Sequence, residues 1–248
     1  MSLAACQHCG APLVVGAVGC DRCGRYLSGD ELSRGTGAGA VQTQLGTRVR
    51  AALLEGRYRL VEPIAVGRSS TVWRAHDTAL DRPVAVKVLD EASARSPEAV
   101  ARFERRAQKL ASVEHPAVVP VLAAGTAEPN PFLVMPLIAG VTLAEHLHAS
   151  GGALSPPAVA ELVGTLCEAF AVLHATEHRE AGLELRHVLV NAAGQPTLLD
   201  AGLEGSSRGS AGALAPKLAS GGRPGPRSDV YALAAVAVEL LRGHPLAG

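Results

Sequence analysis

The chain has 248 residues, which is enough for one ordinary domain and a small additional module. Its 23 Lys and Arg residues balance 23 Asp and Glu residues, so no net charge attracts the whole protein to nucleic acid or to an anionic membrane. The longest apolar run near the end, Val230 to Leu241, contains Glu239 and is too short to span a bilayer, and no signal-peptide pattern opens the sequence. We therefore expect a soluble, cytoplasmic protein with no membrane contact.

Two identical Cys-x-x-Cys-Gly motifs near the N-terminus contain four of the five cysteines, namely Cys6, Cys9, Cys20 and Cys23. Two thiolates separated by two residues can hold one metal ion, and four sulfurs complete a tetrahedral Zn²⁺ shell. The pattern resembles a short zinc ribbon over residues 1–27, in which Zn²⁺ has a structural role. A disulfide pair is the alternative, which the absence of a secretion signal disfavours. We expect the ribbon to bind protein partners and no nucleic acid, because it lacks a basic and aromatic stripe.

Residues 28–53 form the next segment, in which glycines alternate with polar residues and no apolar period is sustained. Such a composition predicts a flexible linker. The remaining residues, 54–248, show regular apolar patterns and are expected to form the main domain.

Three segments at the start of this domain have the apolar pattern of strands: residues 57–64, residues 71–77 and the run Val84-Ala85-Val86-Lys87. A turn of small residues around Gly67 joins the first two, and such a turn can fold over a phosphate. Ala85 and Lys87 share one face of their strand, because side chains two residues apart point the same way. An ammonium group beside a small side chain suits a nucleotide.

These motifs resemble the start of a protein kinase, whose signature is a Gly-rich loop followed by a Val-Ala-Ile-Lys strand. The order and spacing of motifs over residues 54–248 resemble those of the bacterial Ser/Thr kinases of the eukaryotic-like family. The resemblance implies an α+β, bilobal fold, with a five-stranded N-terminal lobe over residues 54–138 and a helical C-terminal lobe over residues 139–248. It also implies an ATP site formed by Gly67, Val72, Ala85, Lys87, Met135, Ile138, Leu189 and Asp200.

A helix is predicted over residues 96–113, with Pro97 in its first turn. By resemblance it is the regulatory helix, whose glutamate pairs with the strand lysine in active kinases. Here Arg106 stands at the position of that glutamate, and Glu104 lies about 200° away around the helix. Two strands are expected next, over residues 118–124 and 131–135, followed by Met135 at the gatekeeper position and a hinge over residues 136–138.

Two helices are predicted in the C-terminal lobe. Thr142 and Glu145 form a capping box that opens a short helix, and Ser155-Pro156 begins a long one. The long helix has apolar residues at helical spacing, namely Val159, Leu162, Val163, Leu166, Phe170 and Leu173. We expect Cys167, which lies among them, to be buried as well.

The catalytic loop is located by the strand His187 to Val190, a turn at Gly194 and the segment Thr197 to Gly202. Counting back by resemblance, Gly182 stands at the catalytic aspartate, and His187 stands at the asparagine that holds a second Mg²⁺. Glu180 and Glu184 are the weak candidates for a replacement general base.

Downstream, Asp200 retains the aspartate that holds Mg²⁺ in the family, and Ala215-Pro216-Lys217 resembles the end of an activation segment. Ser228-Asp229 opens a core helix that is predicted to end near Arg242-Gly243. The family has several further helices after this one, so we expect an incomplete C-terminal lobe.

The resemblance therefore predicts a pseudokinase that scaffolds or regulates partners and binds ATP weakly, with little use of Mg²⁺ and with Lys87 paired to Asp200 at rest. An atypical Ser/Thr kinase of low activity is one alternative. A scaffold that binds no nucleotide is another.

Overall fold

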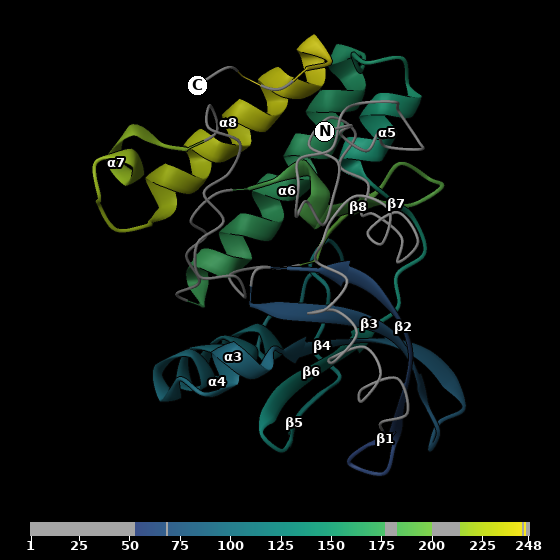
Figure 1. Ribbon diagram of the computed structural model, residues 1–248. Coiled ribbons are helices and arrows are strands. Elements are labelled where there is room, and N and C mark those ends of the chain that lie inside the picture. The colour runs from purple at the N-terminus through teal and green to yellow at the C-terminus, as the bar shows by residue number, and fades with distance from the viewer. Residues whose placement is uncertain (1–52, 68, 177–182, 200–213, 245, 247–248) are drawn as a thin grey trace, which may run out of the picture. The chain divides into compact units, whose positions relative to one another are not determined.

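The computed structural model describes residues 53–67, 69–176, 183–199, 214–244 and 246 (Figure 1). These residues divide into two compact units. The sheet unit contains the described residues of 53–105 and 121–138, and the helical unit contains those of 106–120 and 139–246. The four cysteines of the predicted zinc ribbon and residues 28–52 of the predicted linker lie outside the described residues.

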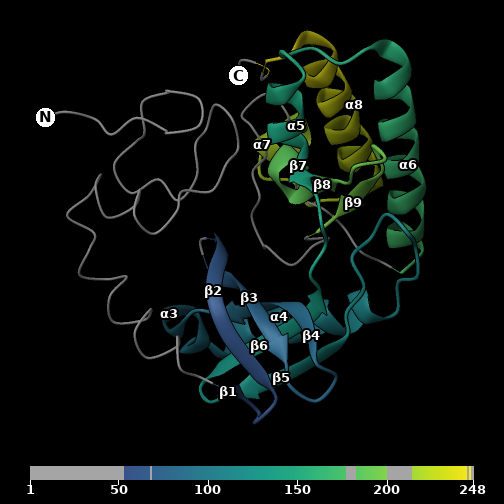
Figure 2. The ribbon, with the colours of Figure 1, turned by 90° about the vertical axis from the view of Figure 1, so that its right-hand side faces the viewer.

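The sheet unit is built on six antiparallel strands in the order β1-β2-β3-β4-β6-β5 (Figure 2). Without the two-residue β1, this sheet has five strands, the predicted number, but one of them does not have the predicted bounds. The strands are β1 (Leu53–Leu54), β2 (Tyr58–Val66), β3 (Ser70–Asp77), β4 (Arg82–Leu89), β5 (Ala123–Ala127) and β6 (Asn130–Pro136).

Side chains on the two faces of this sheet differ in kind. One face carries the apolar core of the unit: Leu54, Tyr58, Leu60, Trp73, Ala75, Val84, Val86, Val88, Phe132 and Val134. Because side chains alternate along a strand, Val72, Ala85, Lys87 and Met135 lie on the opposite face. The predicted ATP-binding strand residues are therefore separated from the packed core by the thickness of the sheet.

Two helices follow β4. The short helix α3 (Glu91–Ala94) was not predicted, although its N-cap residue Asp90 accepts a hydrogen bond from the Ser93 N–H at 2.7 Å, which is a local signal. The helix α4 (Pro97–Ala111) lies within the predicted range and buries Phe103, Ala107 and Leu110. The chain passes between the two units within α4, because Arg105 belongs to the sheet unit and Arg106 to the helical unit.

The helical unit contains α5 (Leu143–Ala149), α6 (Pro156–Ala175), α7 (Pro216–Ala219) and α8 (Pro226–Arg242). The predicted capping box is confirmed, since Thr142 Oγ1 accepts from the Glu145 N–H at 3.1 Å and Glu145 Oε2 accepts from the Thr142 N–H at 2.8 Å. The long helices α6 and α8 pack against each other (Figures 1 and 2). The end of α8 is also as predicted, because Gly243 forms its C-cap with φ +77°.

A small antiparallel sheet, β7 (Val141–Thr142), β8 (Val188–Val190) and β9 (Pro196–Leu198), lies beside these helices. The 3₁₀ turn η1 (Leu185–His187) precedes β8, and Gly194 with φ +79° forms the predicted turn between β8 and β9. The strand prediction for residues 118–124 is wrong. Val118 makes an isolated parallel bridge with Leu198 in the helical unit, Pro120 has no N–H to donate, and β5 begins only at Ala123.

Helix α6 requires one further correction. Cys167 is exposed, and so is not the buried filler that its apolar surroundings predicted. Val159, Leu162, Leu166, Ala169, Phe170 and Leu173 are the buried side chains of this helix. By length and hydropathy alone α6 resembles a membrane span, but its contacts with α8 and β9 are those of a core helix.

Candidate functional site

The predicted ATP-binding residues of the sheet unit meet on the three central strands. In the register of the sheet, Val72 lies opposite Lys87, and Ala85 lies opposite Met135. Lys87 is 3% exposed, Ala85 6% and Met135 5%. One buried ammonium group therefore lies two residues from a small apolar side chain, on a face lined by apolar neighbours. This arrangement suits a ligand with an apolar ring and a negatively charged end.

The turn between β2 and β3 is held by backbone hydrogen bonds. The Gly67 N–H donates to Ser70 O at 2.8 Å, and the Asp90 N–H donates to Ser69 O at 2.9 Å, which fastens the turn to the end of β4. Ser70 is 2% exposed and lies on the same face as Val72. Among the described residues its Oγ has no hydrogen-bond partner, so this end of the face carries an unsatisfied polar group.

The predicted hinge follows β6 directly. Pro136 is the last residue of that strand, and Leu137 and Ile138 are half-buried. Ile138 is also the last residue of this part of the sheet unit. Proline lacks an N–H but keeps its carbonyl, which is the group that the kinase resemblance requires at this position.

The helical unit positions a second group of predicted residues on η1 and β8. Leu189 is half-buried and lies opposite Thr142 on β7 and Thr197 on β9. His187 is the last residue of η1, and its carbonyl accepts from the Leu199 N–H at 2.9 Å. The backbone of the predicted catalytic-loop hairpin is therefore ordered by its own hydrogen bonds.

Glu184, one candidate for a replacement base, is already engaged. Its carboxylate forms an ion pair with the guanidinium of Arg186, and its side chain is 14% exposed. Accepting a proton there would break the ion pair. The other predicted positions of this loop, Glu180, Gly182 and Asp200, lie outside the described residues.

The predicted ATP-binding residues are divided between the two units. Leu189 belongs to the helical unit, whereas Gly67, Val72, Ala85, Lys87, Met135 and Ile138 belong to the sheet unit. Arg106 is half-buried in the helical unit, so its predicted repulsion of Lys87 stays a prediction. Within the described ranges, no three His, Cys, Asp or Glu side chains gather as a metal site would require.

A buried hydrogen bond joins the two long helices of the helical unit. His174 on α6 and Asp229 on α8 are linked by a hydrogen bond of 2.7 Å between Nε2 and Oδ2, and the Asp229 side chain is 1% exposed. The residues are 55 positions apart in the sequence, so only the fold brings them together. The hydrogen bond therefore ties α6 to the first turn of α8.

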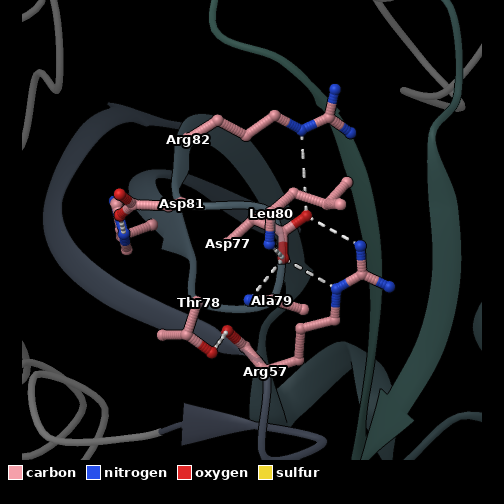
Figure 3. Close-up of polar contacts among 8 residues, drawn as sticks. Arg57, Asp77, Thr78, Ala79, Leu80, Asp81 and Arg82 are labelled. Carbon is pink, nitrogen blue, oxygen red and sulfur yellow. Dashed lines mark hydrogen bonds and ion pairs between the residues drawn. The ribbon is translucent and has the colours of Figure 1, made fainter.

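Sequence reasoning missed an ion-pair cluster in the sheet unit (Figure 3). Arg57 donates from Nε to Asp77 Oδ1 at 2.7 Å and from Nη2 to Oδ2 at 2.8 Å, while the N–H groups of Ala79 and Leu80 also donate to Oδ1. These hydrogen bonds, the Arg57 one first, lower the pKa of Asp77 to about 2 against the opposing effect of burial. The same hydrogen bond raises the pKa of Arg57. The register of the β2–β3 hairpin could have indicated this ion pair, because Tyr58 lies opposite Asp77 and Arg57 is the neighbouring residue in the chain.

Comparisons with known proteins agree with this geometry. The Serine/threonine-protein kinase PknL of Mycobacterium tuberculosis is 35% identical over 214 residues, which cover 81% of this chain and 53% of PknL. For PknB of the same organism the identity is 34% over 209 residues, covering 77% of this chain and 33% of PknB. The chain thus spans about half the length of PknL and about a third of the length of PknB.

The fold has solved counterparts. The crystal structure of the Mycobacterium tuberculosis PknI kinase domain matches with a TM-score of 0.67 and 24% identity, over 80% of this chain and 79% of that one. The family described as "Protein tyrosine and serine/threonine kinase" matches residues 58–245, which include both units. With kinase motifs on β4 and β8 and a kinase fold around them, the chain belongs to the protein kinase family, and its relatives PknL and PknB are bacterial Ser/Thr kinases.

Proposed function

We propose that this protein is a pseudokinase, which scaffolds or regulates protein partners and binds ATP weakly. The observation that carries the proposal is His187. It ends an ordered 3₁₀ turn before β8, at the position that the kinase resemblance gives to a Mg²⁺-binding asparagine. Imidazole does not fit that role, because Mg²⁺ prefers oxygen ligands. In the same loop of the sequence, Gly182 offers no side chain that could accept the substrate proton.

Weak ATP binding is supported by the side chains on the Lys87 face of the sheet in the sheet unit. Val72, Ala85 and Met135 offer an apolar surface for adenine, and Lys87 offers a cation for the phosphates. The unsatisfied hydroxyl of Ser70 adds a polar group at the phosphate end. We further propose that Ile138 and Leu189 complete the adenine contacts and that Lys87 pairs with Asp200 at rest. Binding would then depend little on Mg²⁺.

The second candidate is an atypical Ser/Thr kinase of low activity, with Glu180 or Glu184 as general base. It is favoured by the names of PknL and PknB and by the retained Lys87 and Asp200. Against it, the Glu184 carboxylate is engaged by Arg186. A third candidate, a scaffold without nucleotide, would leave the Lys87 face without a ligand.

A melting experiment separates these candidates. We expect ATP to raise the melting temperature of the full chain slightly, by the same amount with Mg²⁺ as with a chelator. Lys87→Met should abolish the shift, while Lys217→Met, which removes an exposed lysine of α7, should leave it unchanged. A much larger shift with Mg²⁺ would show that a metal ligand works in this site. No shift at all would favour the scaffold without nucleotide.

Phosphotransfer is tested separately. We expect no measurable radiolabel transfer from ATP to the protein itself or to generic substrates, because losing a general base typically costs about 10² to 10⁴ in rate. If the protein does transfer label, and Glu180→Gln or Glu184→Gln stops the transfer, the low-activity kinase replaces our proposal.

The N-terminal motifs support a second part of the proposal. We propose that Cys6, Cys9, Cys20 and Cys23 bind one structural Zn²⁺ and that the ribbon over residues 1–27 docks protein partners in the cytoplasm. Protein purified under reducing conditions should contain about one Zn²⁺ per chain. Cys9→Ser should lose that metal, whereas Cys167→Ser, at an exposed position of α6, should retain it. Absence of zinc from the wild type would contradict the ribbon.

A further inference from the structure

Helix α8 has two faces with different surroundings. The face that packs within the helical unit, where α8 contacts α6, contains the buried residues of the helix (Figure 1): Ser228, Asp229, Ala232, Leu233, Ala235, Val236, Glu239 and Leu240. The opposite face carries four apolar residues that are between 40% and 63% exposed: Val230, Tyr231, Val238 and Leu241. Single exposed apolar residues are common on soluble proteins, so the arrangement of these four decides whether they form a surface.

These apolar residues lie in one stripe along the helix. Successive residues of an α-helix are rotated by about 100°, so the positions of the four residues fall within an arc of roughly 100°. The exposed Ala234 lies inside the same arc. We call these five residues the α8 stripe: Val230, Tyr231, Ala234, Val238 and Leu241. Spacings of three, four and seven residues are those by which one helix packs its apolar side chains against another.

Arginines stand at both ends of the α8 stripe. Arg227 is in the first turn of α8 and Arg242 is its last residue, and both are exposed. The structure describes every residue of α8, and the two carboxylates of this helix, Asp229 and Glu239, are both buried on the packed face. Neither arginine forms an ion pair with another described residue. The exposed face is therefore apolar along its length and positively charged at each end.

The position of Arg227 is not explained by the helix itself. The N-terminus of a helix carries a partial positive charge, which disfavours a cation in the first turn and favours one in the last turn. Arg242 therefore suits its position and Arg227 does not. Arg223, which is also exposed, adds a second cation just before the helix begins. Side chains that break such a local preference are often kept for function, and here the charge is available to an anionic group of a partner.

We propose that the α8 stripe binds an amphipathic helix of a partner protein, whose apolar face is bounded by Asp or Glu at each end. Arg227 and Arg242 are separated by about four turns, or roughly 22 Å along the axis, which sets the spacing of the two acidic ends. Carboxylates placed there form charge-assisted hydrogen bonds with the guanidinium groups. The inference rests on the proposed scaffold function, but this binding needs neither ATP nor Zn²⁺ and is tested without them.

Other occupants fit the α8 stripe less well. A second copy of this chain would bring arginines together, since antiparallel stripes place Arg227 beside Arg242 and parallel stripes place each arginine beside its own counterpart. Helices that lie on anionic membranes keep a charged face in water, whereas the other face of α8 is packed within the unit. Nucleic acid requires cations along the whole contact and not an apolar centre.

The test uses the full chain and two synthetic helical peptides of about 18 residues, which is five turns. Both peptides have Leu along one face, and they differ only in having Glu or Lys at the two ends of that face. Binding is measured by fluorescence anisotropy. The variants are the double change Arg227→Glu with Arg242→Glu, and Val238→Ser. Their matched controls are Arg102→Glu, at an exposed cation of α4, and Val61→Ser, at a half-exposed valine of β2.

We expect the wild type to bind the Glu peptide roughly tenfold more tightly than the Lys peptide, because two exposed ion pairs are replaced by two repulsions. The double arginine variant should reverse this preference. Val238→Ser should weaken binding of both peptides by roughly three- to tenfold, as expected for an apolar contact at the centre of an interface. Arg102→Glu and Val61→Ser should match the wild type. Melting temperatures of all variants show whether each is folded.

Four results would overturn the proposal. Binding of neither peptide would show that the α8 stripe does not accept a helix, and equal binding of both would show that the arginines do not select the partner. Wild-type binding to phosphatidylserine vesicles that Val238→Ser abolishes would assign the stripe to a membrane. Concentration-dependent self-association, measured by sedimentation and abolished by Val238→Ser, would assign it to a second copy of this chain. A loss of ATP or Zn²⁺ binding would bear on those proposals alone.

Discussion

Each unit of this protein contains an almost completely buried aspartate, and the two units hold that carboxylate in different ways. Asp77 in the sheet unit and Asp229 in the helical unit both have side chains that are 1% exposed. Asp77 is held by a guanidinium group and two backbone N–H groups within neighbouring hairpins. Asp229 is hydrogen-bonded by an imidazole from another helix, 55 residues away. In the sheet unit the Asp77 carboxylate therefore connects strands that are already neighbours. In the helical unit the Asp229 carboxylate joins two helices whose contact residues are far apart in the sequence.

The largest effect should come from breaking the long-range contact. Asp229→Ala leaves His174 without this carboxylate and removes a buried charged group from the start of α8. We expect a loss of about 3 to 5 kcal/mol in the free energy of unfolding, measured by urea denaturation. The control is Glu62→Ala, whose carboxylate is 56% exposed and pairs with Arg74. A loss below about 1 kcal/mol for Asp229→Ala would remove the contrast between the two units.

A backbone contact of the helical unit should give the next effect. Gly243 ends α8 with φ +77°, and a Cβ there would lie 2.5 Å from the Gly152 carbonyl carbon and 2.7 Å from the Ala153 nitrogen. Gly243→Ala should therefore cost about 1 to 2 kcal/mol for the left-handed conformation alone, and more from the contact with residues 152–153. Gly194→Ala has a similar φ of +79° with no atom within 4 Å, so it isolates the conformational part. Equal losses in the two variants would mean that the close approach is unimportant.

The Asp77 carboxylate of the sheet unit should make the stability of the protein depend on pH. The pKa of Asp77 falls from its ordinary value of 3.8 to about 2 in the folded protein, so folding favours the ionised form. The stabilisation is present above the unfolded-state pKa and is lost as the pH falls toward 2. The wild type should thus lose stability more steeply between pH 4 and pH 2 than Asp77→Asn does, in thermal melts at each pH. Parallel curves would contradict the assignment.

The smallest effect is expected at the surface of the same sheet. Arg74 and Glu62 form an ion pair of 2.9 Å, with side chains that are 47% and 56% exposed. Exposed pairs contribute about 0 to 1 kcal/mol because water screens the charges and two flexible side chains must be ordered. Glu62→Ala should change the melting temperature only marginally, and added salt should not alter that result. A loss comparable with that of Asp229→Ala would show that burial does not distinguish these contacts.

Local signals in the sequence predicted much of the fold. Thr142 and Glu145 contain their capping box within four consecutive residues, and Gly243 marks the end of α8 by its own conformation. The alternation of β3 and β4 placed Ala85 and Lys87 on one face, as the register confirms. Each of these features depends on residues a few positions apart, which is why a single sequence reveals them.

Other features depend on distant parts of the chain and were missed. The apolar residues around Val118 have strand character, but their backbone partner is Leu198, 80 positions later, and no local pattern indicates it. Cys167 lies among apolar residues, yet the face of α6 that packs is set by Leu166 and Leu173 and leaves the thiol exposed. The hydrogen bond from the Thr126 N–H to the Glu55 carboxylate gave no signal either, since the two residues are 71 positions apart.

The candidate site divides in the same way. Its sheet-unit residues were predictable because they occupy one strand and its neighbours in regular register. The ion pair between Glu184 and Arg186 was not predicted, although the two residues are only two positions apart. Their contact requires the turn at η1, and the surrounding sequence has no strong turn signal beyond the family resemblance.

The strand order of the sheet has a consequence for synthesis on the ribosome. β5 is translated before β6, yet β6 lies between β4 and β5, so β5 cannot join the growing sheet by itself. The two-residue connection between Ala127 and Asn130 lets β5 and β6 close as a hairpin, which then docks on β4. Domains emerge at about 5 to 20 residues per second, so the exposed interval is a matter of seconds. Until β6 has emerged from the ribosome, the edge of β4 with which it pairs is uncovered, which is the state in which a strand edge can associate with another chain.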